Sequence, residues 1–84
     1  MENRVALIGI VVENFDEVAE LNRILHEYSD YIIGRMGIPY RKRDVSIISV
    51  AIDAHSDIIN AISGKIGKLK GVTSKTVYAK LDEE

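Results

Sequence analysis

The sequence carries one pattern of apolar residues twice, forty residues apart, and this repeat constrains the fold more than any other feature. Each copy opens on a nearly all-apolar segment, "RVALIGIVVE" at residues 4–13 and "DVSIISVAID" at residues 44–53. Apolar residues at helical spacing follow in both copies, and then a second extended segment. The matched positions in the two opening segments are Val5 with Val45, Leu7 with Ile47, Ile8 with Ile48, Ile10 with Val50, Val12 with Ile52 and Glu13 with Asp53.

The repeat predicts four strands and two helices. We expect the strands at residues 4–13, 30–41, 44–53 and 72–80 and the helices at residues 15–28 and from residue 56 to Gly71. Asn14 and Glu17 have the spacing of a capping box before the first helix. Ser56 and Asp57 open the second helix, and Gly71 is expected to end it.

A doubled strand–helix–strand of this size is typical of the α+β, ferredoxin-like βαββαβ sandwich. Right-handed crossovers place both helices on one face of a four-stranded antiparallel sheet, with the first and third strands in the middle. The edge strands then hold most of the glycine, proline and basic residues of the strands. Residues 1–84 are short enough to form one domain.

The two central strands are apolar on both faces, although helices cover only one. In the first strand Val5, Leu7 and Val11 alternate with a second apolar set, Ala6, Ile8, Ile10 and Val12. An uncovered apolar sheet face is an aggregation hazard for a monomer. We therefore predict a homo-oligomer, either a homodimer or a homotetramer, that packs sheet on sheet or joins strand edges.

Composition narrows the classes of partner. The net charge is −2, and the central strands hold no aromatic residue on which a nucleotide base could stack, so nucleic-acid binding is disfavoured. The chain has no cysteine, and its longest apolar run, "VALIGIVV", is too short to cross a bilayer. We expect a cytoplasmic protein without a membrane partner.

No residue pattern predicts catalysis or a cofactor. The six serines lack the context of a nucleophile elbow, and "SGKIGK" lacks the upstream glycine and the Ser or Thr of a phosphate-binding loop. His26 and His55 are the weak candidates for a metal ligand. Asp53 and Asp57 flank His55 at alternate positions, but helix capping explains that pattern more simply than a metal does.

The stretch "GRMGIPYRKR", residues 34–43, is the candidate site for a small ligand. Its glycines permit a bulge or the close approach of a ligand or another backbone. The candidate contacts are Gly34, Arg35, Met36, Gly37 and Ile38, together with Asn14 after the first strand. The alternative is a bent edge strand whose basic turn, Arg41–Arg43, protects it from aggregation.

Four segments, "IGIVVEN", "YIIGRMGIPY", "VSIISV" and "SGKIGKLKGV", resemble the family of iron-only hydrogenase system regulators. The resemblance runs from Arg4 to about Ala79, and "YIIGRMGIPY" is its most specific motif. The family is named for an association with hydrogenase maturation genes. Its fold is similar to ACT domains and to the C-terminal domain of nickel-responsive repressors, so the resemblance implies effector binding and assembly through the sheet.

The resemblance carries over only in part. His26 matches the place of a nickel-binding histidine in the repressors, but Gly37, Pro39 and Val45 stand where the other ligands would be. We therefore expect no nickel site. The segment "ENFDEV" lacks the proline and glycine with which ACT domains often receive an amino acid.

The leading hypothesis is a non-enzymatic, ACT-like regulatory domain that assembles with itself and binds a small effector at the edge of the second strand or at a subunit interface. The alternative is a protein–protein interaction module without a small ligand, with a hydrogenase-maturation protein as a candidate partner. A metal sensor and a nucleic-acid-binding regulator are the weaker alternatives.

Overall fold

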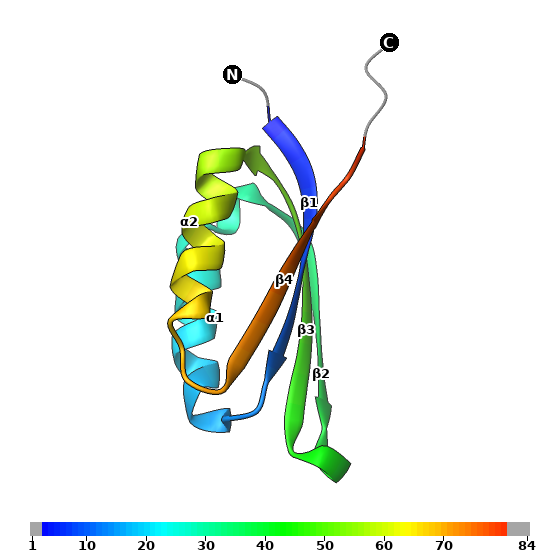
Figure 1. The fold of residues 1–84 in the computed structure, drawn as a ribbon, viewed down its shortest axis with the longest axis vertical. Helices are drawn as coiled ribbons and strands as arrows, with labels where there is room; N and C mark the ends of the chain where they lie inside the picture. Colours follow the sequence, from blue (N-terminus) through cyan, green and yellow to red (C-terminus); the bar gives the residue numbers. More distant parts are fainter. Residues whose placement is uncertain (1–2, 81–84) are drawn as a thin grey trace.

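A computed structural model describes residues 3–80 as one four-stranded antiparallel sheet with two helices on one of its faces (Figure 1). In chain order the elements are β1 (Asn3–Val12), α1 (Val18–Glu27), β2 (Ile32–Tyr40), β3 (Val45–His55), α2 (Ser56–Gly67) and β4 (Val72–Tyr78). Short 3-10 turns lie at Phe15–Glu17, Ser29–Tyr31 and Arg41–Arg43. This arrangement confirms the predicted ferredoxin-like βαββαβ fold. No helix within residues 3–80 is long and apolar enough to cross a membrane.

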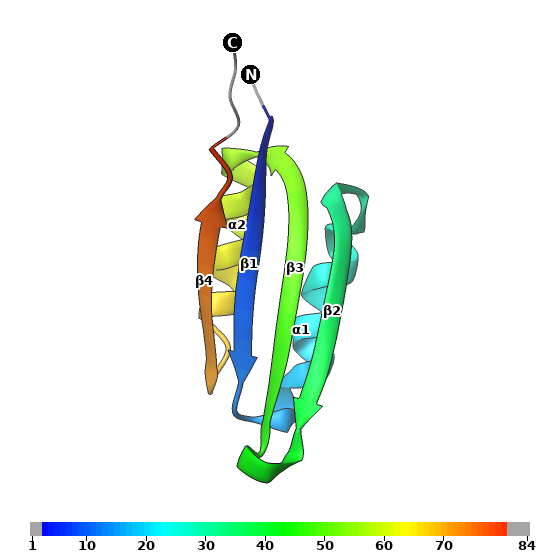
Figure 2. The ribbon, with the colours of Figure 1, turned by 90° about the vertical axis from the view of Figure 1, so that its right-hand side faces the viewer.

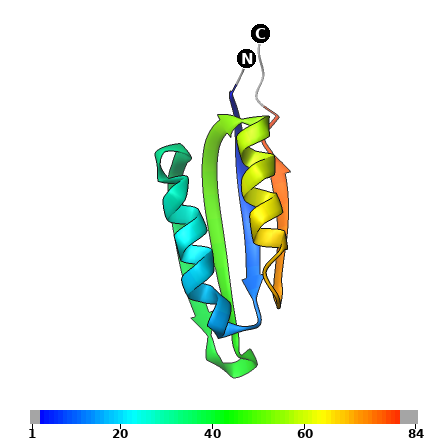
Figure 3. The ribbon, with the colours of Figure 1, turned by 90° about the vertical axis from the view of Figure 1, so that its left-hand side faces the viewer.

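The strands lie in the order β2-β3-β1-β4, so β1 and β3 form the centre of the sheet and β2 and β4 its edges (Figure 2). The two most apolar strands therefore occupy the two middle places, as the sequence predicts. Both helices lie on the same face of the sheet. Helix α1 covers the β2–β3 side of this face, and α2 covers the β1–β4 side (Figure 3).

The hydrophobic core lies between the helices and this face of the sheet. Side chains on alternate positions of β1 and β3 meet the inner sides of α1 and α2. The buried apolar residues are Ala6, Ile8, Ile10, Val12, Leu21, Ile24, Leu25, Ile48, Val50, Ile52, Ala54, Ile59, Ile62 and Ile66. The repeat explains the strand residues of this set. Ile8, Ile10 and Val12 lie forty residues before Ile48, Val50 and Ile52, which occupy equivalent places in the partner strand.

The start of α1 differs from the expected capping box. The Asn14 side chain caps the 3-10 turn Phe15–Glu17 instead, because its Oδ1 accepts a hydrogen bond from the Asp16 amide at 3.1 Å. The Glu17 amide donates to the backbone carbonyl of Asn14 at 2.9 Å. The first turn expected for the helix at residue 15 is therefore 3-10, and regular α-helix begins only at Val18.

The second helix begins where it is predicted, but with a different cap and an earlier end. His55 is the N-cap, since its Nδ1 accepts a hydrogen bond from the Asp57 amide at 3.1 Å. The helix ends at Gly67, four residues before the expected terminator Gly71. Gly71 adopts a left-handed φ of 70° that turns the chain into β4. Glycine adopts such a φ without the strain that most side chains impose there, which explains the glycine.

The edge strand β2 is shorter than the expected residues 30–41, since residues 30 and 31 belong to a 3-10 turn and Arg41 begins the next one. A β-bulge between Ile32 and Gly34 shifts the register against β3, which is one of the two results expected for this glycine. Beyond the bulge the strand runs to Tyr40, and Asp44 closes the hairpin in the left-handed region at φ 56°.

Candidate functional site

The most prominent surface is the open face, which we define as the face of the sheet turned away from the helices and towards the viewer in Figure 2. Residues directly opposite one another in neighbouring strands point to the same face. By the observed register, the open face consists of Val5, Leu7, Gly9 and Val11 in β1, Val45, Ile47, Ser49, Ala51 and Asp53 in β3, Gly34, Met36, Ile38 and Tyr40 in β2, and Thr73, Lys75 and Val77 in β4.

Large apolar side chains on this face are exposed to solvent. Residues 3–80 hold ten exposed large hydrophobic side chains, and seven belong to the open face. The seven are Leu7, Val11, Met36, Ile38, Tyr40, Ile47 and Val77. Exposed apolar patches on soluble proteins mark interaction sites when the side chains are contiguous. Because these seven occupy adjacent strands of one sheet, they form such a patch.

The open face is not flat. Small side chains at Gly34, Ser49 and Ala51 leave a depression of about 260 Å³ beside Leu7 and Met36. Ala51 also lines a second, almost purely apolar depression of about 220 Å³, with Val5, Leu7 and Val77 around it. Ala51 and Leu7 therefore line both depressions.

A larger concavity of about 600 Å³ lies at the end of the open face next to the β2–β3 turn. Its lining is Val11, Glu13, Tyr40, Arg43, Asp44 and Val45. This volume lies within the range of about 300–1,000 Å³ that small-molecule sites occupy. Val11 and Val45 contribute apolar surface, and the polar groups are a guanidinium, a phenol and two carboxylates. The concavity therefore offers partners to a ligand that carries both a positive and a negative charge.

The structure divides the predicted ligand contacts of β2 between the two faces. Gly34, Met36 and Ile38 lie on the open face, while Arg35 and Gly37 lie on the helix side. The Arg35 Nη2 donates a hydrogen bond to Asn22 Oδ1 in α1 at 2.6 Å. These five residues therefore line no single concavity, although Gly34, Arg35 and Met36 share the 260 Å³ depression.

Asn14 is not brought together with the β2 residues. It follows the end of β1, whereas Gly34 lies level with Leu7, in the middle of β1, and two strands away from that strand. Its side chain is occupied in capping the Asp16 amide. Asn14 also packs against Gly71, and this contact joins the two chain crossings at that end of the molecule.

The two histidines belong to separate elements. His26 is exposed in the last turn of α1, and His55 caps α2 at the end of β3. Within residues 3–80, no three His, Asp, Glu or Cys side chains lie together as a metal site requires. The arrangement "DAHSD" is used as a helix start, with the His55 Nδ1 only 3.6 Å from an Asp57 carboxylate oxygen.

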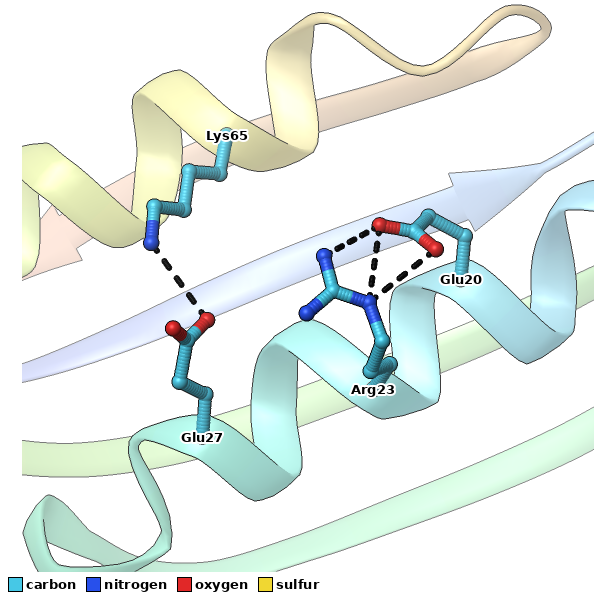
Figure 4. Close-up of polar contacts among 4 residues, drawn as sticks. All are labelled: Glu20, Arg23, Glu27 and Lys65. Atoms are coloured by element: carbon cyan, nitrogen blue, oxygen red, sulfur yellow. Dashed lines mark hydrogen bonds and ion pairs between the residues drawn. The ribbon is translucent and has the colours of Figure 1, made fainter.

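The helix surface carries charged pairs rather than an apolar patch. In α1 the Arg23 guanidinium donates hydrogen bonds to the Glu20 carboxylate, and Lys65 of α2 reaches Glu27 of α1 at 3.3 Å (Figure 4). The hydrogen bond from Arg23 lowers the pKa of Glu20. Tyr28 and, secondly, Glu27 raise the pKa of Lys65. The four side chains are between 43% and 62% exposed, so solvent screens both pairs and they contribute little to stability.

Two features of the open face are not among those predicted from the sequence. The first is the pair Gly9 and Ser49, which lie opposite one another at the centre of the open face, and the second is the concavity beside Tyr40 and Arg43. A signal for the first was present, since Gly9 and Ser49 have the same spacing of forty residues as the six matched pairs. The second depends on how the β2–β3 turn folds back, which the local sequence does not specify.

The chain is similar to a known protein family and to a solved structure of high similarity. The family model "TM1266-like: Iron-only hydrogenase system regulator, putative" matches residues 4–76. The solved structure of the uncharacterized protein TM1266 from Thermotoga maritima superposes with a TM-score of 0.90 at 36% identity, covering 94% of this chain and 100% of that one. No curated protein matches the sequence significantly.

A distant structural neighbour supports the fold alone. A formyltetrahydrofolate deformylase from Pseudomonas putida KT2440 superposes with a TM-score of 0.63 at 10% identity. The match covers 87% of this chain but only 28% of the deformylase. At this identity the likeness indicates a shared sandwich architecture and no shared chemistry.

Proposed function

The chain belongs to the TM1266-like family of iron-only hydrogenase system regulators, and from this premise we propose that it regulates by assembly and binding rather than by catalysis. In this proposal the folded unit is a homo-oligomer that uses the open face as its subunit interface. The family description supports the regulatory role. The chemistry of the open face supports the mode of action.

One observation carries the proposal: seven large apolar side chains share one face, and each is at least 37% exposed. Removing a large apolar side chain from water stabilises a complex by about 1.5–3 kcal/mol when burial is complete, so each half-exposed residue offers on the order of 1 kcal/mol. A face-to-face dimer buries these residues in both copies, so the total gain is on the order of 10 kcal/mol. This gain exceeds the lower part of the association cost, about 4–15 kcal/mol. The face is therefore suited to a dimer of moderate affinity.

The test compares two substitutions of equal exposure. Ile47 on the open face and Phe15 in the first 3-10 turn are both 46% exposed. Ile47→Asp places a carboxylate in the middle of the open face, where burial without a partner is unfavourable. Phe15→Asp adds the same charge outside that face. Sedimentation equilibrium should show association of the wild-type chain and of Phe15→Asp, and a monomer for Ile47→Asp.

A wild-type chain that remains monomeric up to about 100 μM, a concentration at which a dimer with a Kd near 1 μM would be almost complete, contradicts this proposal. Unchanged association of Ile47→Asp places the interface elsewhere. Retention of a hydrogenase-maturation protein by a monomeric chain would instead favour the interaction-module alternative.

A second candidate function is effector binding, and the 600 Å³ concavity favours it. Because its lining combines Arg43 with Glu13 and Asp44 over an apolar floor, the class of ligand that fits is a small zwitterion with an apolar part. Thermal-shift measurements against a panel of amino acids test this function, with nucleotides and divalent cations as comparison ligands. The stabilisation expected for an amino acid should disappear in Arg43→Gln. A panel without any shift contradicts the effector function.

A further inference from the structure

Gly9 has no structural reason within its own chain. It lies in the middle of the central strand β1, its φ is not positive, and a Cβ built on it meets no atom within 4 Å. A glycine inside a strand weakens the strand, and it often marks a place where a ligand or another backbone approaches closely. A second backbone that approaches the open face at Gly9 would explain the glycine.

Gly9 is also at the centre of a local symmetry. It lies directly opposite Ser49 in the β1–β3 ladder, and it precedes Ser49 by forty residues, the spacing of the repeat. A local two-fold axis normal to the sheet thus passes through the Gly9–Ser49 pair and relates Leu7 to Ile47 and Val11 to Ala51. The open face resembles itself after half a turn about this point.

We propose that a second copy of this chain packs face to face on the open face, with the dimer axis crossing the Gly9–Ser49 pair. This inference rests on the proposed function and deepens it, because it fixes where the two sheets come closest. An isologous interface needs a self-complementary patch. Small residues at the crossing point let the sheets approach, and the raised side chains on either side of it enter the depressions around Ala51 of the other copy.

Charge selects between the two directions that the dimer axis can take. The row across the sheet through this point reads Met36, Ser49, Gly9 and Lys75. An axis along this row would set Lys75 against Lys75 of the second copy, with like charges opposed. An axis along the strands sets Lys75 against Met36 of the second copy. Since opposed like charges at an interface are unfavourable, the axis runs along the strands.

The first arm of the experiment enlarges the crossing point. Gly9→Val introduces a residue that strands favour into open space, so the separated chain should fold as well as the wild type or better. The same side chain holds two packed sheets apart, and we expect the dimer Kd to rise at least about tenfold. Gly64→Ala, at an exposed glycine of α2 with no atom within 4 Å, is the matched control and should leave the Kd unchanged.

The second arm tests the direction of the axis. With the axis along the strands, Met36→Glu gives Lys75 of the other copy an opposite charge, and Met36→Lys gives it a like charge. The glutamate variant should therefore dimerise more tightly than the lysine variant, and high salt should reduce the difference. With the axis along the row, residue 36 of one copy faces residue 36 of the other copy. Each variant then opposes two like charges, so both variants weaken the dimer.

The outcomes distinguish the position of the dimer axis from the use of the open face as an interface. An unchanged Kd for Gly9→Val, or equal weakening by Met36→Glu and Met36→Lys, overturns this inference even if Ile47→Asp abolishes the dimer. A monomeric wild-type chain, or a dimer indifferent to Ile47→Asp, overturns the proposed function and this inference together. Sedimentation equilibrium supplies every Kd, and circular dichroism below the Kd confirms that each separated variant is folded.

Discussion

Gly71 and Asn14 pack so closely that a Cβ added to Gly71 would lie 3.0 Å from the Asn14 Cβ. The Glu13 amide also donates to the Gly71 carbonyl at 2.7 Å, so the chain leaving β1 is held against the chain entering β4. This contact joins the start of the β1–α1–β2 crossing to the end of the β3–α2–β4 crossing. It makes Gly71 the glycine whose replacement the fold tolerates least.

Gly71→Ala should therefore destabilise the protein. The left-handed φ of 70° costs a residue with a side chain about 1–2 kcal/mol, and the crowding against Asn14 adds to this, for a total of about 1–3 kcal/mol. Gly64→Ala, in an exposed helix position, should instead raise the free energy of unfolding by about 0.5–1 kcal/mol. Urea unfolding at one fixed protein concentration compares the two. Equal effects of the two substitutions would contradict the role given to Gly71.

The cap of α2 gives a second prediction. His55→Ala removes the acceptor for the Asp57 amide and should lower the free energy of unfolding by about 0.5–2 kcal/mol. His55→Asn supplies another side-chain acceptor and should retain most of the stability. A loss as large in His55→Asn as in His55→Ala would show that the imidazole has a role other than capping.

A half-buried pair of hydroxyls links α2 to β4, with Ser63 Oγ 3.0 Å from Thr76 Oγ1. Thr76→Val leaves the Ser63 hydroxyl without this partner and should cost about 0.5–1.5 kcal/mol. Adding Ser63→Ala removes the orphaned group, so the double variant should be more stable than Thr76→Val alone. Chemical denaturation of the four forms of the cycle measures this, and a strictly additive loss would be against it.

The Glu20–Arg23 pair predicts a weak dependence of stability on acid. The hydrogen bond from Arg23 holds the pKa of Glu20 below its ordinary value of 4.5. A lowered folded-state pKa stabilises the fold above the unfolded-state pKa, and this contribution is lost as pH falls through the folded-state value. Glu20→Gln and Arg23→Gln should both flatten the fall of the unfolding midpoint between about pH 5 and pH 3. Profiles parallel to the wild type would exclude the pair as the cause.

Much of the fold follows from the positions of apolar residues. The alternation in β1 and β3 predicts which side chains are buried, because Ile8 and Ile48 must share the covered face if Leu7 and Ile47 share the other. The caps were harder to predict, since Asn14 and His55 bond to amides two residues ahead and local spacing alone allows several partners. Gly71 is predicted to end α2, but the helix already ends at Gly67 and Gly71 instead turns the chain into β4 with its left-handed φ.

The sequence does not predict which residues of the candidate site share one face of the sheet. Gly34 to Ile38 are consecutive, yet alternate residues of a strand belong to opposite faces, so a run of five cannot line one side. The depression at Ala51 depends on the register of β2 against β3, which the bulge after Ile32 sets. A slip of one residue would turn Met36 to the helix side, and no local pattern decides that register.

The order of the strands in the sheet has a consequence for how the chain is made. The most apolar segment, β1, is synthesised first, yet its ladder pairs Asn3 with His55 and Ala6 with Tyr78. During translation β1 therefore waits for nearly the whole chain before both of its edges are paired. The hairpin of β2 and β3, closed by Asp44, is the one strand pair of residues 3–80 that can form locally. On the ribosome, the apolar β1 therefore has no strand partner until β3 has been synthesised.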